Sequence, residues 1–212
     1  RVSAVDDFEI TGKGDAPAWR IAPWGEMTLL GSEPLQGGYT TRFKLLRSAK
    51  GIYLYFEGED QRVTSTMEQD NLDLWKEDCF ELFLMPDESK PAYFEYEVSP
   101  LGKELPLMIT HLSGKEGWLP WKYEGERRVQ KKVAAKGGEL RSNGAIGSWS
   151  AEIFVPYALL KGLGNTPPRA GSVWKANFYR MDYDSGRGRG WAWAPVGGSF
   201  HEYAKFGRLR FD

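Results

Sequence analysis

The sequence has few of the residues that form disulfides and most metal centres. Its 212 residues include one cysteine, Cys79, and two histidines, His111 and His201. One cysteine excludes an intrachain disulfide, and so few cysteines and histidines argue against a zinc site built from them. We therefore expect a protein without a disulfide and without a cofactor.

The chain also lacks a strong net charge and a long hydrophobic run. Its 28 Lys and Arg residues nearly balance its 29 Asp and Glu residues, for a net charge of -1. Nothing therefore draws the whole protein towards nucleic acid or an anionic membrane. No apolar run approaches the ~20 residues of a membrane helix. We expect no nucleic-acid partner and no membrane-spanning segment, so any ligand must bind at a local site.

Aromatic and turn-forming residues, in contrast, are abundant. The chain has 9 Trp, 10 Tyr, 11 Phe, 25 Gly and 12 Pro, a mixture that favours strands joined by tight turns. Period-two patterns recur and helical patterns are scarce. The sequence predicts an all-β fold, an antiparallel β-sandwich, with residues 1–212 as a single domain. The expected strands are 41–46, 52–56, 78–85, 93–99, 127–133, 148–155, 174–182, 190–193 and 206–211, with one helical turn at 156–160.

Alternation within these strands predicts which side chains share a face. In the strand at 93–99, Glu95 and Glu97 alternate with large apolar residues, so we expect the two glutamates on a solvated face. In the strand at 78–85, Glu81 shares a face with Cys79 and Phe83. A carboxylate buried beside apolar side chains needs hydrogen-bond partners or must lose its charge, which favours a function for Glu81.

Trp75 stands out because it lies in a polar stretch just before a strand. One interpretation is that its ring caps the end of the core. The other is that it projects from a loop as a flat apolar platform for a sugar ring, whose hydroxyls seek polar partners nearby.

Several segments resemble the carbohydrate-binding modules of family 9. The run Trp75-Lys-Glu-Asp-Cys-Phe-Glu-Leu-Phe83 is similar to their Trp-x-x-Asp-x-x-Glu-x-Phe motif, and Lys205-Phe-Gly-Arg-Leu209 to their closing Lys-Phe-Gly-x-Leu. Three further segments follow the family order: 52–60, 149–156 and 177–182. The resemblance covers roughly residues 40 to 212.

The resemblance implies a β-sandwich that holds a terminal sugar between two aromatic side chains. The matching positions are Trp75 and, five residues before the Lys of Lys-Phe-Gly, Phe200. Glu81 matches the sugar-binding Glu of the family, where a carboxylate can accept two vicinal hydroxyls. Asp60 matches another polar position of the site.

Two positions depart from the family pattern and leave the ligand open. Glu97 stands where the family has an arginine, and Tyr179 where it has a glutamine. Arg180 is a candidate replacement donor, although alternation turns it to the opposite strand face unless a bulge intervenes. Structural calcium also occurs in the family; no spaced Asp-x-Asp-x-Asp loop marks a site here, so calcium stays open.

The resulting hypothesis is non-catalytic binding of mono- or oligosaccharides and polysaccharide chain ends, in carbohydrate catabolism and polysaccharide utilisation. The resemblance implies a secreted protein, extracellular or periplasmic. A glycoside hydrolase, or an accessory part of one, is the first alternative, because Glu95 and Glu97 share a strand face. A haem-binding sandwich could use Met67, Met85 and the two histidines, and an aromatic patch would also suit a protein partner.

Overall fold

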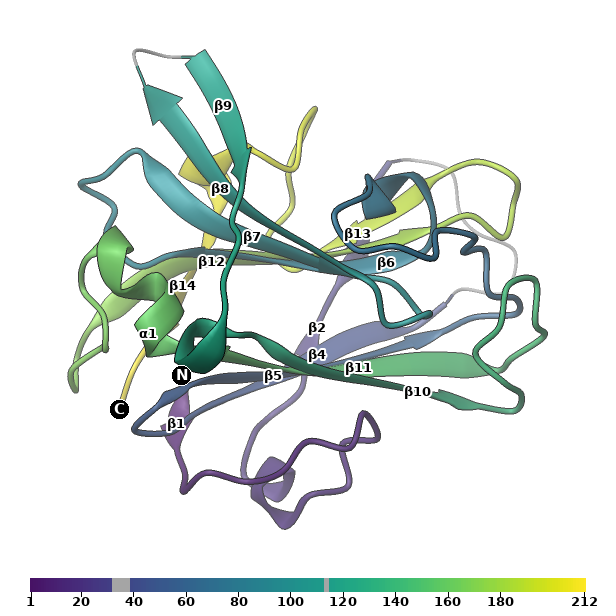
Figure 1. The fold of residues 1–212 in the computed structure, drawn as a ribbon, viewed down its shortest axis with the longest axis horizontal. Helices are drawn as coiled ribbons and strands as arrows, with labels where there is room; N and C mark the ends of the chain where they lie inside the picture. Colours follow the sequence, from purple (N-terminus) through teal and green to yellow (C-terminus); the bar gives the residue numbers. More distant parts are fainter. Residues whose placement is uncertain (32–38, 113–114) are drawn as a thin grey trace.

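The structure is a computed structural model that describes residues 1–31, 39–112 and 115–212. Two sheets lie face to face, which confirms the predicted β-sandwich (Figure 1). All strand pairs are antiparallel except β1 with β4. None of the helices in these ranges has the length and apolar character needed to span a bilayer.

The six-stranded sheet has the order β1-β4-β5-β11-β10, with β2 paired to β4. Its strands are β1 (Ser3–Ala4), β2 (Gly25–Glu26), β4 (Thr41–Arg47), β5 (Gly51–Glu59), β10 (Gln130–Lys136) and β11 (Ser148–Pro156). The strand predicted at 127–133 is thus shifted by three residues, but it lies at a sheet edge as its charges indicate.

The eight-stranded sheet has the order β3-β13-β12-β6-β7-β8-β9, with β14 paired to β12. Its strands are β3 (Thr28–Leu29), β6 (Cys79–Met85), β7 (Ala92–Val98), β8 (Glu104–Leu112), β9 (Lys115–Pro120), β12 (Val173–Asp182), β13 (Arg189–Ala192) and β14 (Gly207–Arg210). The helical elements are short: α1 (Tyr157–Leu160) and the 3-10 turns η1 (Pro17–Arg20), η2 (Leu74–Lys76), η3 (Gly125–Arg127), η4 (Lys161–Leu163) and η5 (Tyr203–Lys205).

The main core lies between the two sheets and is built largely from aromatic rings. Phe56 of β5 stacks on Phe80 of β6, with ring centroids 4.8 Å apart, and Trp149 of β11 lies 4.1 Å from Phe80. All three side chains are completely buried. Burial of each such ring contributes roughly 1.5–3 kcal/mol, so the sandwich is held mainly by this cross-sheet packing.

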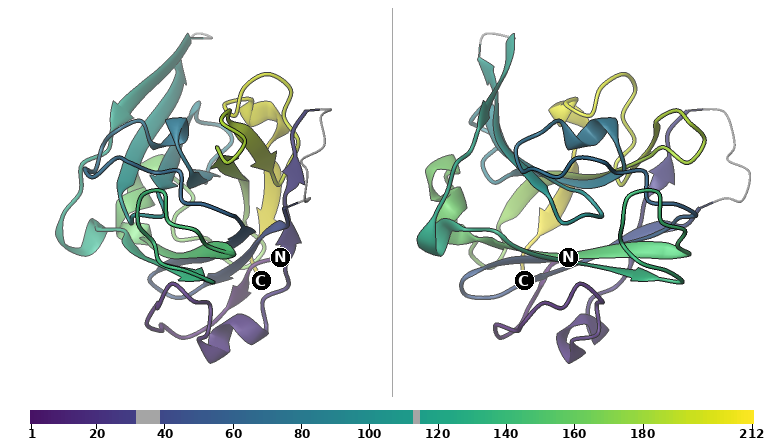
Figure 2. Two further views of the ribbon diagram at one scale, coloured as in Figure 1. Left: turned by 90° about the vertical axis from the view of Figure 1, so that its right-hand side faces the viewer. Right: turned by 45° about the vertical axis from the view of Figure 1, so that its right-hand side comes forward.

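The outer faces of both sheets are covered as well. The N-terminal segment lies over the outer face of the six-stranded sheet (Figure 2). There the Trp19 indole donates a hydrogen bond to the buried Glu152 over 2.5 Å. On the outer face of the eight-stranded sheet, Phe83, Tyr93 and Tyr179 form a second apolar cluster. Glu95 and Glu97 lie on this outer face and are 4% and 1% exposed. The expectation of a solvated face for them is wrong, because loops and a hairpin cover it.

That hairpin, β8 and β9, has no counterpart among the predicted strands. The run Leu105-Pro-Leu-Met-Ile109 does not alternate between apolar and polar residues, and it contains a proline, which argues against a strand. Tertiary pairing with β7 places it in the sheet nonetheless. The hairpin rises from the sheet and forms one wall of the candidate site (Figure 1).

Candidate functional site

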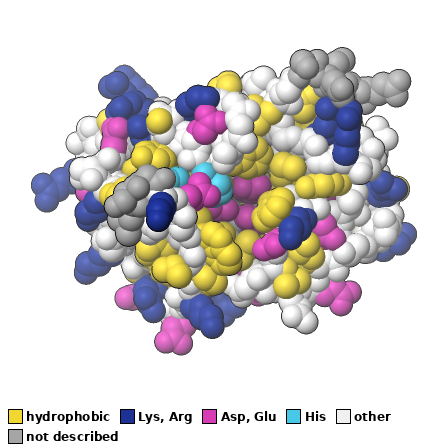
Figure 3. Space-filling model, turned by 90° about the horizontal axis from the view of Figure 1, so that it is seen from above, with side chains coloured by type: hydrophobic (Ala, Val, Ile, Leu, Met, Phe, Trp, Pro, Cys, Tyr) yellow, Lys and Arg dark blue, Asp and Glu magenta, His cyan; other side chains and the backbone are white. Residues whose placement is uncertain are grey.

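A cavity of about 680 Å3 opens on the outer face of the eight-stranded sheet, a size typical of small-molecule sites. Seen from this side, acidic side chains lie at the centre next to histidine, with hydrophobic side chains around them (Figure 3). The lining residues are Leu30, Asn71, Asp73, Trp75, Glu81, Glu95, Glu97, Leu105, Leu107, Ile109, Glu116, Trp118, Pro120, Met181, Val196–Gly198, Ser199, Phe200 and His201.

Strand register brings three glutamates together at the floor of this cavity. Glu81 of β6 lies directly opposite Glu97 of β7, and Glu95 shares the same strand face two residues earlier. Carboxylate oxygens of the three lie within 4.8 Å of one another. We call Glu81, Glu95 and Glu97 the glutamate triad. Its next neighbours on β8, Leu105 and Leu107, are apolar. The three carboxyl groups therefore lie beside apolar side chains.

Burial controls the protonation of the triad. It raises the pKa of each of the three carboxyl groups well above the ordinary 4.5, and repulsion between neighbouring members raises it further. The partners are few. Glu81 accepts a weak hydrogen bond from the Cys79 thiol at 3.6 Å, and Oε2 of Glu97 accepts one from the backbone N–H of Trp75 at 2.9 Å. A side-chain hydrogen bond between Glu95 and Glu97 lowers the pKa of Glu95 and raises that of Glu97. The triad is therefore an electrostatically costly arrangement that folding alone does not explain.

Trp75 is presented to the cavity by the short turn η2. The preceding Leu74 is buried and anchors the turn, while Trp75 is 47% exposed. Its backbone is held on both sides, since its N–H donates to Glu97 and its carbonyl accepts from the Tyr183 hydroxyl at 2.8 Å. The indole thus projects from a fixed backbone, and the alternative that Trp75 caps the core is wrong.

Phe200 reaches the cavity from the loop that precedes η5. Its ring stacks on the buried Tyr179, with centroids 4.1 Å apart and planes 6° from parallel. The Tyr179 hydroxyl donates to the Phe200 carbonyl at 2.7 Å and accepts from the Asn177 side-chain amide at 2.7 Å. Tyr179 therefore lies behind Phe200 and supports it, outside the residues that line the cavity.

His201 lies beside the triad but supplies no fixed positive charge. Its Nδ1 lies 2.7 Å from the Tyr93 hydroxyl and 3.9 Å from Oε2 of Glu95. Burial lowers the pKa of its imidazole below the ordinary 6.5. His201 is therefore neutral at neutral pH, and its ring packs over Phe83 at 5.4 Å.

Asp60 and Arg180 lie on the other side of the eight-stranded sheet. Arg180 extends into the core, where it pairs with Asp60 at 3.1 Å and Asp182 at 2.7 Å, all three side chains being fully buried. It also donates to Thr41 of the six-stranded sheet at 3.1 Å. Alternation along β12 sends Arg180 away from the cavity, and no bulge reverses it. The structure therefore does not bring the predicted pair, Asp60 and Arg180, to the site.

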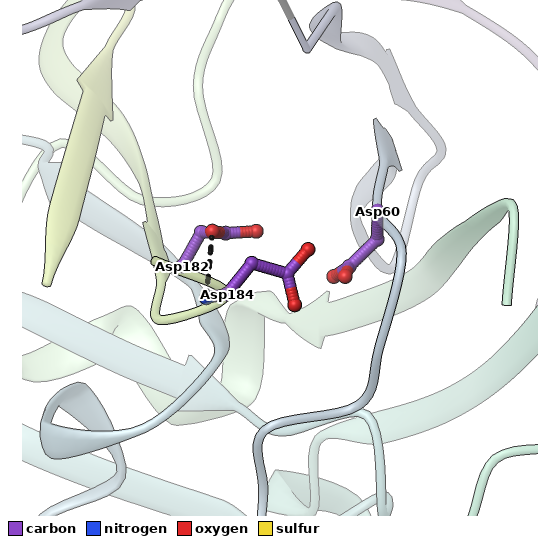
Figure 4. Close-up of side chains that lie close together, drawn as sticks. All are labelled: Asp60, Asp182 and Asp184. Carbon is purple, nitrogen blue, oxygen red and sulfur yellow. Dashed lines mark hydrogen bonds between the residues drawn. The ribbon is translucent and has the colours of Figure 1, made fainter. Parts of the chain in front are cut away.

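Asp60, Asp182 and Asp184 form a second carboxylate group whose oxygens lie within 4.8 Å of one another (Figure 4). Arg180 and backbone N–H groups already bind the oxygens of Asp60 and Asp182. Among the described carboxylate oxygens of this group, only Oδ1 of Asp184 is buried without a hydrogen bond. Calcium takes six to eight oxygens, so this group does not fit a calcium cage, and structural calcium stays a prediction.

The cavity thus unites Trp75, Phe200, Glu81 and Glu97 from the predicted site. It also includes lining residues that the sequence did not single out for sugar binding, among them Glu95, Trp118 and His201. Trp118 is 65% exposed on β9. Like Trp75, it lies in a polar stretch of the sequence, and this signal would have identified it as a candidate site residue. Glu95 needed the strand register, which alternation alone does not give.

Comparison with known proteins agrees with this geometry. The family profile of carbohydrate-binding family 9 matches residues 36–211. A search of curated proteins gives no match. Among solved structures, a candidate carbohydrate-binding protein of Bacteroides uniformis is similar in fold, with a TM-score of 0.76, 18% identity, and coverage of 100% of this chain and 97% of its own.

Two structures of a family 9 carbohydrate-binding module from Caldicellulosiruptor kristjanssonii are also similar. The complex with glucose has a TM-score of 0.67 and 14% identity and covers 100% of this chain and 95% of its own. The complex with cellotriose has a TM-score of 0.66 and 15% identity and covers 99% and 92%. Identities this low show a shared fold, and the family match extends over most of the sequence. The chain belongs to carbohydrate-binding family 9.

Proposed function

We propose that the cavity binds a sugar ring of a mono- or oligosaccharide, or of a polysaccharide chain end, without catalysing a reaction of the sugar. The observation that carries the proposal is that a half-exposed indole, Trp75, and a supported phenyl ring, Phe200, line the same cavity as buried carboxylates. Aromatic faces pack against the C–H groups of a pyranose, while carboxylates accept hydrogen bonds from its hydroxyls.

The family supports a role in polysaccharide utilisation outside the cytoplasm, in the extracellular space or the periplasm. The fold-related module of Caldicellulosiruptor kristjanssonii binds glucose and cellotriose, which are natural first ligands to test. We expect affinities in the μM to mM range, because each hydroxyl exchanges water for a protein partner at little net gain.

One observation favours the rival function of a glycoside hydrolase: the triad oxygens lie within 4.8 Å of one another, near the roughly 5–5.5 Å of retaining enzymes. Such an enzyme needs one ionised carboxylate and one protonated one, with their pKa values pushed apart. Burial and mutual repulsion raise the pKa of all three glutamates together. This common shift favours binding over catalysis.

The haem alternative has less support in the geometry. Of Met67, Met85, His111 and His201, only His201 lines the cavity. Met85 is 2% exposed within the second apolar cluster, so it cannot face a ligand in the cavity from the opposite side.

The test is titration calorimetry of the protein with glucose, xylose and cellotriose, after a glycan-array screen. We expect saturable binding that Trp75→Ala reduces by about 10- to 100-fold, since the lost contact is worth roughly 1.5–3 kcal/mol. Trp24→Ala is the matched control, because this indole packs on the outer face of the six-stranded sheet. Equal loss in both variants, or no binding to any glycan, contradicts the proposal, and sustained release of reducing sugar would establish the hydrolase.

A further inference from the structure

The cavity has a one-sided charge. Its described lining contains five acidic residues and one histidine but neither lysine nor arginine. Three of the acids form the glutamate triad at the floor, and Asp73 and Glu116 lie towards solvent with side chains 55% and 45% exposed. Burial favours the protonated form of the triad in the empty cavity, and a cation bound beside carboxyl groups favours their ionised form. A lining with only acidic groups and a neutral histidine therefore suits a positively charged ligand.

The chain supplies no cation to the triad. Lys76 of η2 pairs with Asp73 at 2.6 Å, and its Nζ lies 5.1 Å from the Trp75 ring centroid. Burial and the neighbouring His111 lower the pKa of His201 and favour its neutral form. In the Asp60 group, by contrast, Arg180 sits between the carboxylates. Within residues 1–31, 39–112 and 115–212, the fold therefore neutralises one buried acidic group internally and gives the other no lysine or arginine partner.

Glu95 shows most directly that a partner is missing. It is 4% exposed and lines the cavity, and apart from the carboxyl group of Glu97 its Oε2 has no hydrogen-bond donor in the described chain. Ionising a buried carboxyl group that has no donor costs several kcal/mol, so burial favours the protonated form of Glu95 until a ligand supplies a donor or a positive charge. Such a group is retained where a ligand supplies the donor, and the cavity gives a ligand access to it.

Two kinds of cation could fill the triad, and the surroundings favour one of them. Calcium needs six to eight oxygen ligands, whereas the triad offers three residues beside the apolar side chains of Leu105 and Leu107. A protonated primary amine has three N–H donors, one for each carboxylate. Its charge also interacts favourably with an indole face such as that of Trp75.

We propose that this cavity selects a sugar with a free, protonated amino group, a hexosamine as monosaccharide or chain end, whose ammonium group binds the glutamate triad. This inference rests on the proposed carbohydrate binding and names the class of sugar. The rings of Trp75 and Phe200 hold the pyranose, and Glu81, Glu95 and Glu97 distinguish the amine from a hydroxyl. An N-acetyl group removes both the charge and two of the three donors, so it is disfavoured.

The experiment compares glucose, glucosamine and N-acetylglucosamine, and then cellotriose and the glucosamine trisaccharide, by calorimetry at neutral pH with a chelator present. We expect glucosamine to bind at least about tenfold more tightly than glucose, and N-acetylglucosamine no more tightly than glucose. In Glu95→Gln the ratio of the glucose and glucosamine dissociation constants falls towards one. Glu139→Gln, an exposed glutamate that does not line the cavity, keeps the ratio of the unmodified protein.

Three other results would overturn the inference. Binding of glucose with no preference for glucosamine overturns the amine inference and leaves sugar binding intact. A failure of every sugar to bind overturns both. Glucose binding that requires added calcium and disappears with chelator shows that the triad holds a metal ion and also overturns the inference. If Glu95→Gln does not fold, the comparison of the three sugars with the unmodified protein still decides.

Discussion

The backbone N–H of Trp75 donates a hydrogen bond to Oε2 of Glu97 over 2.9 Å, which joins the aromatic platform to the glutamate triad. We expect Glu97→Ala to free the turn η2, so that the Trp75 amide exchanges with solvent roughly tenfold faster, as for the loss of a hydrogen bond worth about 1.4 kcal/mol. The affinity for sugar is expected to fall in the same variant, because the Trp75 ring is then less firmly positioned. NMR-detected hydrogen exchange of the Trp75 amide measures the effect.

A matched pair of variants separates this link from a general loss of stability. Glu97→Gln keeps an oxygen that can accept from Trp75 and is expected to restore most of the protection. Glu139→Ala, on the exposed surface, leaves it unchanged. Equal protection of the Trp75 amide in Glu97→Ala and in the unmodified protein would contradict the link.

Tyr179 is expected to act on binding only through Phe200. Tyr179→Phe keeps the stacked ring but removes the hydroxyl that donates to the Phe200 carbonyl and accepts from Asn177. The loss of these bonds lowers the free energy of unfolding by about 1–2 kcal/mol and weakens sugar binding a few-fold. Denaturant unfolding and calorimetry measure the two effects.

Tyr157→Phe is the control for this substitution. Tyr157 is also buried, but its hydroxyl makes no hydrogen bond in the described chain, and it lies outside the cavity lining. We expect stability and affinity to stay close to those of the unmodified protein. If both tyrosine variants lose binding equally, Tyr179 has no specific role in positioning Phe200.

Local sequence patterns predict the features that depend on one short segment. Alternation and motif order were enough to place Trp75, Phe200 and Glu81 in one site, because each depends on a short segment. The burial of Glu95 and Glu97 depends on the β8–β9 hairpin and on loops distant in sequence, which alternation within β7 does not contain. Their face therefore reads as solvated when β7 is considered alone.

Arg180 and Asp60 illustrate the opposite limit. Asp60 matched a polar position of the family site, and Arg180 was a candidate replacement donor next to Tyr179. As alternation along β12 indicated, Arg180 extends into the core, where it pairs with Asp60. Gly58 makes this approach feasible, since a Cβ there would lie 2.6 Å from the Arg180 guanidinium. Such a contact across the sandwich depends on the stacking of two sheets, so segment matching does not predict it.

The loop that carries Phe200 depends on Glu202. Oε1 of Glu202 accepts hydrogen bonds from the backbone N–H groups of Gly197, Gly198 and Ser199. The Lys205 side chain and these donors lower the pKa of Glu202 to about 2. We expect Glu202→Ala to loosen the loop and to weaken sugar binding a few-fold, as measured by calorimetry.

Because the folded pKa of Glu202 lies below the ordinary 4.5, its contribution is present above about pH 4.5 and is lost as the pH falls towards 2. The affinity defect of Glu202→Ala is therefore expected to be unchanged between pH 6 and pH 8. Glu139→Ala is the surface control. A defect that appears only above pH 7 would point to another group.

The glutamate triad has the opposite effect on stability. Burial raises the folded pKa of each member above the ordinary 4.5, so between the unfolded and folded pKa values the native state binds more protons than the unfolded chain. Stability then falls as the pH rises above about 4.5. Asp60, with a pKa raised to about 7, and Asp78, raised to about 8, add to this fall in the ligand-free protein.

Glu81→Gln removes one of these carboxylates without changing its shape. We expect the variant to be more stable than the unmodified protein at pH 8, by about 0.5–2 kcal/mol, as is common when a functional site is relieved of strain. The gain shrinks at pH 5, where the native glutamate is already protonated. Thermal unfolding at pH 5, 6.5 and 8 measures this gain in stability, with Glu139→Gln as control.

Because Gln cannot carry the charge that a ligand requires, the stabilised variant is also expected to bind sugar less tightly. A variant that is less stable at pH 8 than the unmodified protein would show that Glu81 stabilises the fold in its ionised form and is not retained at the expense of stability.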